Sequence, residues 1–196
     1  MPQLPRSEWY DLTRDMNWKV SYVEESQVWP EDLAHSLDIP MENWWSWDEP
    51  YKITYPEYVH NQTGKDESVY AVNQVVSRSK LFDNLDPGWK AAILAHYGAI
   101  AVPEYVAGIG EARMARFGRA AAWRNMATYG TLDETRHGQI QTYFPHGLLA
   151  REPRADWAHK AMHTNEWGAI AARHLFDDMF TANDAVSMAL QLTFTF

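Results

Sequence analysis

Residues 133–137 read Asp-Glu-Thr-Arg-His, and this short stretch predicts the fold better than any other part of the chain. Glu134 and His137 lie three residues apart, so on a helix their side chains leave from the same face. Helical bundles that bind a pair of metal ions use this Glu-x-x-His spacing, together with a further Glu from another helix. A complete site also needs a second Glu and a second Glu-x-x-His, and the chain reaches Phe196 before supplying them. The sequence therefore predicts one half of a paired metal site.

The further Glu comes from an apolar helix upstream of the motif. Asp86 and Pro87 are residue types that favour a helix N-cap and the first helical position. Spacings of three and four residues then define one helical face, which consists of Ile93, Tyr97, Ile100, Glu104, Ala107 and Glu111. Glu104 lies in the middle of this face. Pro103 lacks a backbone donor and predicts a kink beside it.

The motif itself lies in a helix predicted over residues 120–144, ending before Pro145. Its face contains Ala127, Gly130, Glu134, His137, Gln141 and Phe144. Glu-x-x-His also occurs by chance on solvated helix surfaces, but such a surface would not gather small and aromatic residues. We therefore expect Glu104, Glu134 and His137 to ligate a metal through two carboxylates and one imidazole. Asp133 is expected to accept a hydrogen bond from the outer nitrogen of a ligating histidine.

Other residues compete for the role of ligand. Glu111 is an alternative to Glu104, but Arg113 and Arg116 indicate that the helix reaches solvent there. Glu57 and His60 have the motif spacing, but they lie in a segment without helical periodicity. Several further acidic and histidine residues are interpreted as capping, packing or interface groups, namely Asp156, His159, His163, Glu166, His174, Asp177 and Asp178.

Composition excludes several other functions. The formal net charge of −9 argues against nucleic acid or an anionic membrane as a partner, because both favour basic surfaces. The absence of cysteine excludes disulfides, zinc–thiolate sites and iron–sulfur clusters, which leaves oxygen and nitrogen ligands. Residues 1–12 have no apolar core and are not a signal peptide. The most apolar stretch, residues 91–110, is interrupted by polar residues and by proline, so we expect a cytoplasmic protein without a membrane span.

The chain is predicted to divide near residue 85. Residues 1–85 are rich in proline and tryptophan and are interpreted as a docking arm with short helices, among them a helix over 66–82. Residues 86–196 are interpreted as the first part of a helical bundle. A third helix is predicted over 154–180. A fourth, capped by Asn183 or Asp184, has no stop signal before the last residue, so we interpret the chain as truncated within a helix.

A resemblance to a known family extends over essentially all 196 residues. It is carried, in order, by the segments WDEPY, YPEYV, HYGAIAV, RMARF, RNMATYG, DETRHGQ, HTNEW, HLFDD and LTFTF. Together these segments resemble the N-terminal part of the hydroxylase alpha subunit of bacterial multicomponent monooxygenases. The most similar subgroup acts on toluene and related aromatic compounds or on small alkenes.

The resemblance implies an all-α, ferritin-like di-iron bundle, present in part. Glu104, Glu134 and His137 match the ligands of one of two iron ions, and Glu134 matches the carboxylate that bridges to the second. The family's substrate pocket matches Ile100, Pro103, Ala107, Gln141, Phe176, Phe180, Leu192 and Phe196. Pro103 departs from the pattern of the toluene enzymes and narrows the implied pocket.

The implied activity is the O₂-dependent insertion of one oxygen atom into an aromatic ring or across a C=C bond. The implied partners are beta and gamma hydroxylase subunits, an effector protein, and an NADH reductase with or without a Rieske ferredoxin. Three alternatives stay open. They are another di-iron enzyme (a radical generator or a desaturase), an iron-storage or metal-free bundle, and a catalytically silent fragment.

Overall fold

The computed structural model describes residues 8, 11–12, 21–24, 40–46, 52–118, 120–182 and 184–195. Within these ranges every regular element is a helix, which confirms the predicted all-α fold. A short helix, α4 (Met41–Ser46), precedes the long helices. Trp9, Trp18 and Trp29 of the predicted arm lie outside the described residues.

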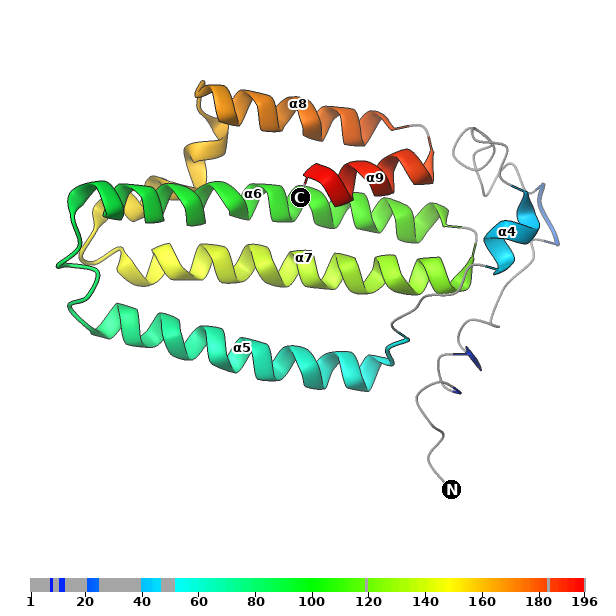
Figure 1. Cartoon of the computed structure of the whole chain (residues 1–196), viewed down its shortest axis with the longest axis horizontal. Helices are drawn as coiled ribbons and strands as arrows, with labels where there is room; N and C mark the ends of the chain where they lie inside the picture. The colour runs from blue at the N-terminus through cyan, green and yellow to red at the C-terminus, as the bar shows by residue number, and fades with distance from the viewer. Residues whose placement is uncertain are drawn as a thin grey trace.

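Two long helices, α6 (Pro87–Phe117) and α7 (Ala121–Leu148), lie side by side in the centre of the molecule (Figure 1). The predicted N-cap of α6 is confirmed, because the Asp86 carboxylate accepts a hydrogen bond from the Gly88 N–H over 2.7 Å. α6 continues through Pro103.

The predicted end of α7 at residue 144 is wrong, because the helix continues through Pro145 to Leu148. A proline this close to a helix end removes one backbone hydrogen bond. Pro145 is buried and Leu148 is fully buried, so their apolar contacts offset that loss.

The single helix predicted over residues 154–180 is also wrong. A 3₁₀ helix, η1 (Pro153–His163), is followed by a break and then by α8 (Trp167–Thr181). Arg173 of α8 holds the break in place, because its Nη1 donates to the carbonyl oxygens of Met162 and Thr164 over 2.6 and 2.8 Å. Spacing along the sequence does not reveal this long-range capping.

The helix predicted after a cap at Asn183 or Asp184 is confirmed as α9 (Ala185–Thr195). Helices α8 and α9 lie together on the side of α6 that faces away from α7 (Figure 1).

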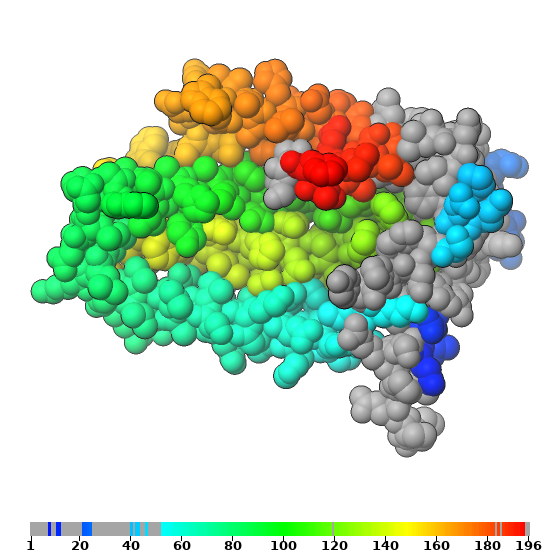
Figure 2. All heavy atoms as spheres, in the orientation of Figure 1, coloured from blue at the N-terminus to red at the C-terminus, as the bar shows by residue number. Residues whose placement is uncertain are grey.

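A further long helix, α5 (Tyr55–Arg78), includes most of the helix predicted over 66–82 but begins earlier and ends at Arg78. It packs along α7, so α5, α7 and α6 form successive rows on the face shown in Figure 2. The segment interpreted as an arm of short helices thus contains a helix of 24 residues.

The core consists of two apolar clusters at opposite ends of the central helix pair. One joins α6 and α7 to α8 and α9, with Ala107, Met114, Ala127, Met179, Ala182, Met188 and Leu192. The other lies against η1 and the loop after α5, with Phe82, Leu94, Phe144, Leu148, Ala155 and Ala158. Along both central helices, Glu104, Glu134 and His137 lie between the two clusters. The three predicted ligands are therefore held between two packed regions.

Helix α6 is long and apolar enough to cross a membrane, judged by length and composition. In the fold it is the central helix, in contact with α7, η1, α8 and α9. A core helix of a soluble bundle has the same composition.

Candidate metal centre

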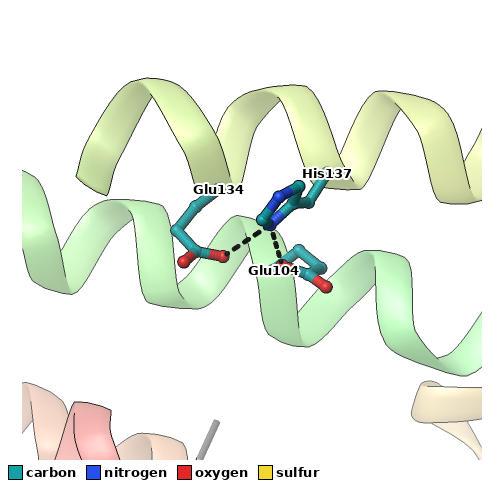
Figure 3. A group of neighbouring side chains, drawn as sticks. All are labelled: Glu104, Glu134 and His137. Atoms are coloured by element: carbon teal, nitrogen blue, oxygen red, sulfur yellow. Dashed lines mark ion pairs between the residues drawn. The ribbon is translucent and has the colours of Figure 1, made fainter. Parts of the chain in front are cut away.

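Three side chains from the central helix pair point toward one another (Figure 3). Glu104 comes from α6, and Glu134 and His137 come from α7. His137 Nδ1 lies 3.3 Å from Glu104 Oε2 and 3.8 Å from Glu134 Oε2. One ligand atom from each residue lies within 4.8 Å of the other two. The structure thus brings together the three residues that the sequence predicted as ligands.

Two glycines lie where α6 and α7 face each other beside the three side chains. Gly108 follows Glu104 by four residues, and a Cβ there would lie 3.3 Å from Glu134 Cβ. Gly138 follows Glu134 by four residues, and a Cβ there would lie 3.8 Å from Glu104 Cβ, an ordinary van der Waals distance. Gly108 therefore makes room for Glu134 on the opposite helix, whereas Gly138 leaves room for a small side chain. This Glu-x-x-x-Gly repeat is visible in the sequence, although the predicted ligand set did not depend on it.

The electrostatics of the cluster are those of a carboxylate pair sharing one imidazole. The Glu104 and Glu134 carboxylates raise the pKa of His137 to about 9. The hydrogen bond to His137 lowers the pKa of Glu104, whereas burial raises the pKa of Glu134. Burial opposes protonation of the His137 ring, but the two carboxylates outweigh it.

The donor set fits a first-row metal ion. Two carboxylates and one imidazole are ligands that iron, manganese and zinc accept, and both carboxylates are mostly shielded from solvent. Glu104 and Glu134 together carry more negative charge than one protonated histidine can balance. A cation at the centre of the three ligand atoms would neutralise the remaining charge.

Metal affinity is expected to increase with pH. A metal on His137 Nδ1 must displace a proton, and the raised pKa of about 9 means that the proton is held throughout the neutral range. Release of one proton predicts about tenfold tighter binding per pH unit below that pKa. Titration of metal-free protein with Co(II) at pH 6.5, 7.2 and 7.9 tests this. Affinity independent of pH would contradict protonation of His137 in the metal-free protein.

Glu111 does not reach solvent as Arg113 and Arg116 suggested. Its carboxylate lies against Gly130, where a Cβ would meet it at 2.7–2.9 Å, and Oε2 is buried without a hydrogen-bond partner. Burial, reinforced by the nearby Glu134 charge, raises the pKa of Glu111 to about 7. The carboxylate is outside the three-residue ligand cluster.

Asp133 has two partners in the structure. It accepts hydrogen bonds from the Tyr58 hydroxyl over 2.9 Å and from Arg136 Nη2 over 3.2 Å. Arg136 in turn lies against His137, so Asp133 reaches the ligand through Arg136. The residues predicted from the motif did not include Tyr58, although Tyr58, Gln62 and Asp66 follow one another at helical spacing.

The predicted pocket residues are distributed over several environments. Ala107 and Leu192 belong to an apolar core cluster with Phe180 packed against it. Phe176 and Phe180 line a cavity of about 410 Å³ between α6, η1 and α8. The half-buried residues of the set are Ile100, Pro103, Gln141 and Phe180, and Phe196 lies outside the described residues.

A second hollow, of about 530 Å³, opens beside Glu134. It is lined by Ala101, Tyr105, Glu134, Thr135, Gly138, Gln139, Thr142, Tyr143 and His146. Among the described residues, Phe176 and Phe180 line the first hollow, whereas Glu134 lines the second. The substrate pocket therefore stays a prediction.

Comparison with known proteins identifies related chains. Over 195 residues the chain is 40% identical to the alpha subunit of the oxygenase component of the alkene monooxygenase system of Xanthobacter autotrophicus. Over 191 residues it is 27% identical to the oxygenase component of phenol 2-monooxygenase of a Pseudomonas species. These alignments include 100% and 94% of this chain but 39% and 36% of the relatives. The chain thus spans about two-fifths of the length of the curated relatives it matches.

The fold is shared with a solved structure. The crystal structure of xenon-pressurized phenol hydroxylase from Pseudomonas sp. OX1 superimposes with a TM-score of 0.79 at 20% sequence identity, covering 98% of this chain and 59% of the other. The family model for methane, phenol and alkene hydroxylases matches residues 18–196. The resemblance seen in the sequence is confirmed, and the chain belongs to the methane/phenol/alkene hydroxylase family.

Proposed function

We propose that the chain is part of the hydroxylase subunit of an O₂-dependent monooxygenase. The reaction is insertion of one oxygen atom into an aromatic ring or across a C=C bond of a small hydrocarbon, with a toluene-like compound as the first substrate to test. The proposal rests on one observation. Glu104, Glu134 and His137 converge between two packed helices in a chain of the methane/phenol/alkene hydroxylase family. A solvated surface stripe would not place these groups between two apolar clusters.

Glu104, Glu134 and His137 would hold one iron ion, and the family resemblance implies that Glu134 would also serve a second. Iron in such a site supplies the one-electron and O₂ chemistry that amino-acid side chains lack. The protein would hold the ligands on two packed helices, where Gly108 leaves room for Glu134 on the facing helix. Both carboxylates are half-buried, which reduces access of water to the centre.

The full system would contain components beyond this chain. The names of both relatives describe an oxygenase component, which implies separate partners that deliver electrons. We propose beta and gamma subunits, an effector protein, and an NADH reductase with or without a Rieske ferredoxin. NADH would act through the reductase, and the assembly would be cytoplasmic.

The proposal is tested with the protein made from its complete reading frame and combined with its electron-transfer components. Incubation with toluene or propene, NADH and isotopically labelled O₂ is expected to give a phenol or an epoxide that carries one labelled oxygen atom. The same mixture with a Glu134→Ala variant is the control and should give background product. A desaturated product, or a tyrosyl radical without oxygen insertion, would replace the proposal with one of the alternative di-iron reactions.

A further inference from the structure

Helix α5 presents a row of polar side chains to α7. Tyr58, Gln62 and Asp66 follow one another at intervals of four residues, so they share one face. The Tyr58 side chain is 7% exposed, and its ring stacks on that of Tyr129 with 4.8 Å between centroids. A buried phenol needs a partner for its hydroxyl, and the Tyr58 O–H donates to Asp133 Oδ1 over 2.9 Å.

These side chains converge on the Arg136 guanidinium. Nη1 of Arg136 donates to Asp66 Oδ1 over 2.6 Å. Nη2 donates to Gln62 Oε1 and to Asp133 Oδ1, each over 3.2 Å. A planar guanidinium that is bonded at two edges has little freedom to rotate. Arg136 is therefore fixed between α5 and α7.

The fixed guanidinium borders the ring of His137. Arg136 Nη2 lies 3.3 Å from Nε2, and on the other side of the ring Nδ1 lies 3.3 Å from Glu104 Oε2. A half-turn of the imidazole would put the carbon Cδ2 where Nδ1 now lies, and the ligand atom would be lost. The orientation of this ring thus decides whether the cluster offers three ligands or two.

We propose that Tyr58 and Asp66 are positioning residues for the metal centre. Asp66 fixes the Arg136 guanidinium directly, and Tyr58 does so through Asp133. The fixed guanidinium packs against the Nε2 edge of His137, so that the ring stays with Nδ1 facing Glu104 and Glu134. α5 carries none of the three proposed ligands, so a third helix sets the geometry of ligands on the other two. This inference rests on the metal centre of the proposed function.

Two conservative variants test the inference. Tyr58→Phe removes one hydroxyl and keeps the stacked ring, and Asp66→Asn removes the charge that holds Arg136. Tyr70→Phe is the matched control, because Tyr70 lies on the same helix and packs edge-on against Tyr143. Metal-free protein from the complete reading frame is titrated with Co(II) against a chromophoric chelator, and the visible spectrum of bound Co(II) is recorded.

We expect Co(II) binding to be about tenfold weaker in Tyr58→Phe and in Asp66→Asn, with an altered Co(II) spectrum, and to change by less than about twofold in Tyr70→Phe. In an Asp133→Asn background, Tyr58→Phe should cause no further loss, since both act along one path.

Three outcomes would overturn the inference. If the wild-type protein binds Co(II), and if the Co(II) affinity and spectrum are unchanged in Tyr58→Phe and Asp66→Asn, the positioning role is overturned. The metal centre would then stand. Independent, additive losses from Tyr58→Phe and Asp133→Asn would exclude the path through Asp133. Failure of the wild-type protein to bind Co(II) would overturn the metal centre and the positioning role together.

Discussion

Replacing Glu134 with alanine is expected to lower metal affinity by more than about 100-fold. Loss of a group that only supports a metal ligand lowers affinity by about 10- to 100-fold, so the loss of a ligand should exceed that range. The carboxylate faces His137 Nδ1 at 3.8 Å, and its neighbour Glu104 completes the cluster. Without Glu134, one carboxylate and one imidazole remain, and two ligands do not retain a divalent ion against a chelator. Metal content per protein chain after dialysis, together with a Co(II) titration, measures the effect.

Glu111→Gln is the control for this experiment. Glu111 lies on the same face of α6, but its carboxylate rests on Gly130 and is outside the ligand cluster. Its pKa of about 7 means that much of the population is already neutral at neutral pH, and glutamine imitates that neutral form. Metal affinity is expected to stay within about threefold of wild type. Equal losses in Glu134→Ala and Glu111→Gln would show that the ligand face of α6 has been misassigned.

Among the glycines that the structure describes, Gly98 is expected to give the largest loss of stability when it is replaced with alanine. A Cβ at Gly98 would overlap the backbone carbonyl of Ala158, so η1 would have to move away from α6. Backbone cannot adapt as the end of a flexible side chain can, and overpacking of this kind costs about 3 kcal/mol. The second apolar cluster, which includes Leu94 and Ala158, would open with it. Denaturant unfolding and hydrogen exchange of the η1 amides report the change.

Gly64→Ala is the matched control, since Gly64 is an exposed helical glycine of α5, and a Cβ added there would meet no atom within 4 Å. It is expected to raise the free energy of unfolding by up to about 1 kcal/mol, because alanine favours the helix. If Gly98→Ala were as stable as Gly64→Ala, the close packing of α6 on η1 would be contradicted.

Local sequence signals were sufficient for the parts of the fold that depend on neighbouring residues. Asp86 and Pro87 define the start of α6, because capping is a local hydrogen bond. The Glu-x-x-His spacing placed two side chains on one face of α7, and the periodicity of α6 placed Glu104 and Glu111 on one face. The helical repeat thus predicted the faces, and the choice of Glu104 rested on its position in the middle of its face and on the arginines near Glu111.

Signals that depend on distant residues were misinterpreted. Pro145 indicated a helix end, but buried contacts of Leu148 carry α7 past it. Residues 154–180 have the composition of one helix, yet Arg173 caps carbonyls on the other side of a break. The arginines near Glu111 suggested solvent, whereas Gly130 on the neighbouring helix provides a buried site for its carboxylate. In each case the deciding contact joins two different elements of the fold.

The helical class and the convergence of Glu104, Glu134 and His137 could be predicted from residue type and from spacing within a helix, and the family could be predicted from its resemblance over nine segments of the chain. How the three predicted ligands are supported became visible only in the folded chain. Gly108 makes room for Glu134 of the facing helix, and Tyr58 reaches Asp133 across 75 positions of sequence. Such support depends on which helix faces align, and alignment is set by the packing of the whole bundle rather than by any local pattern.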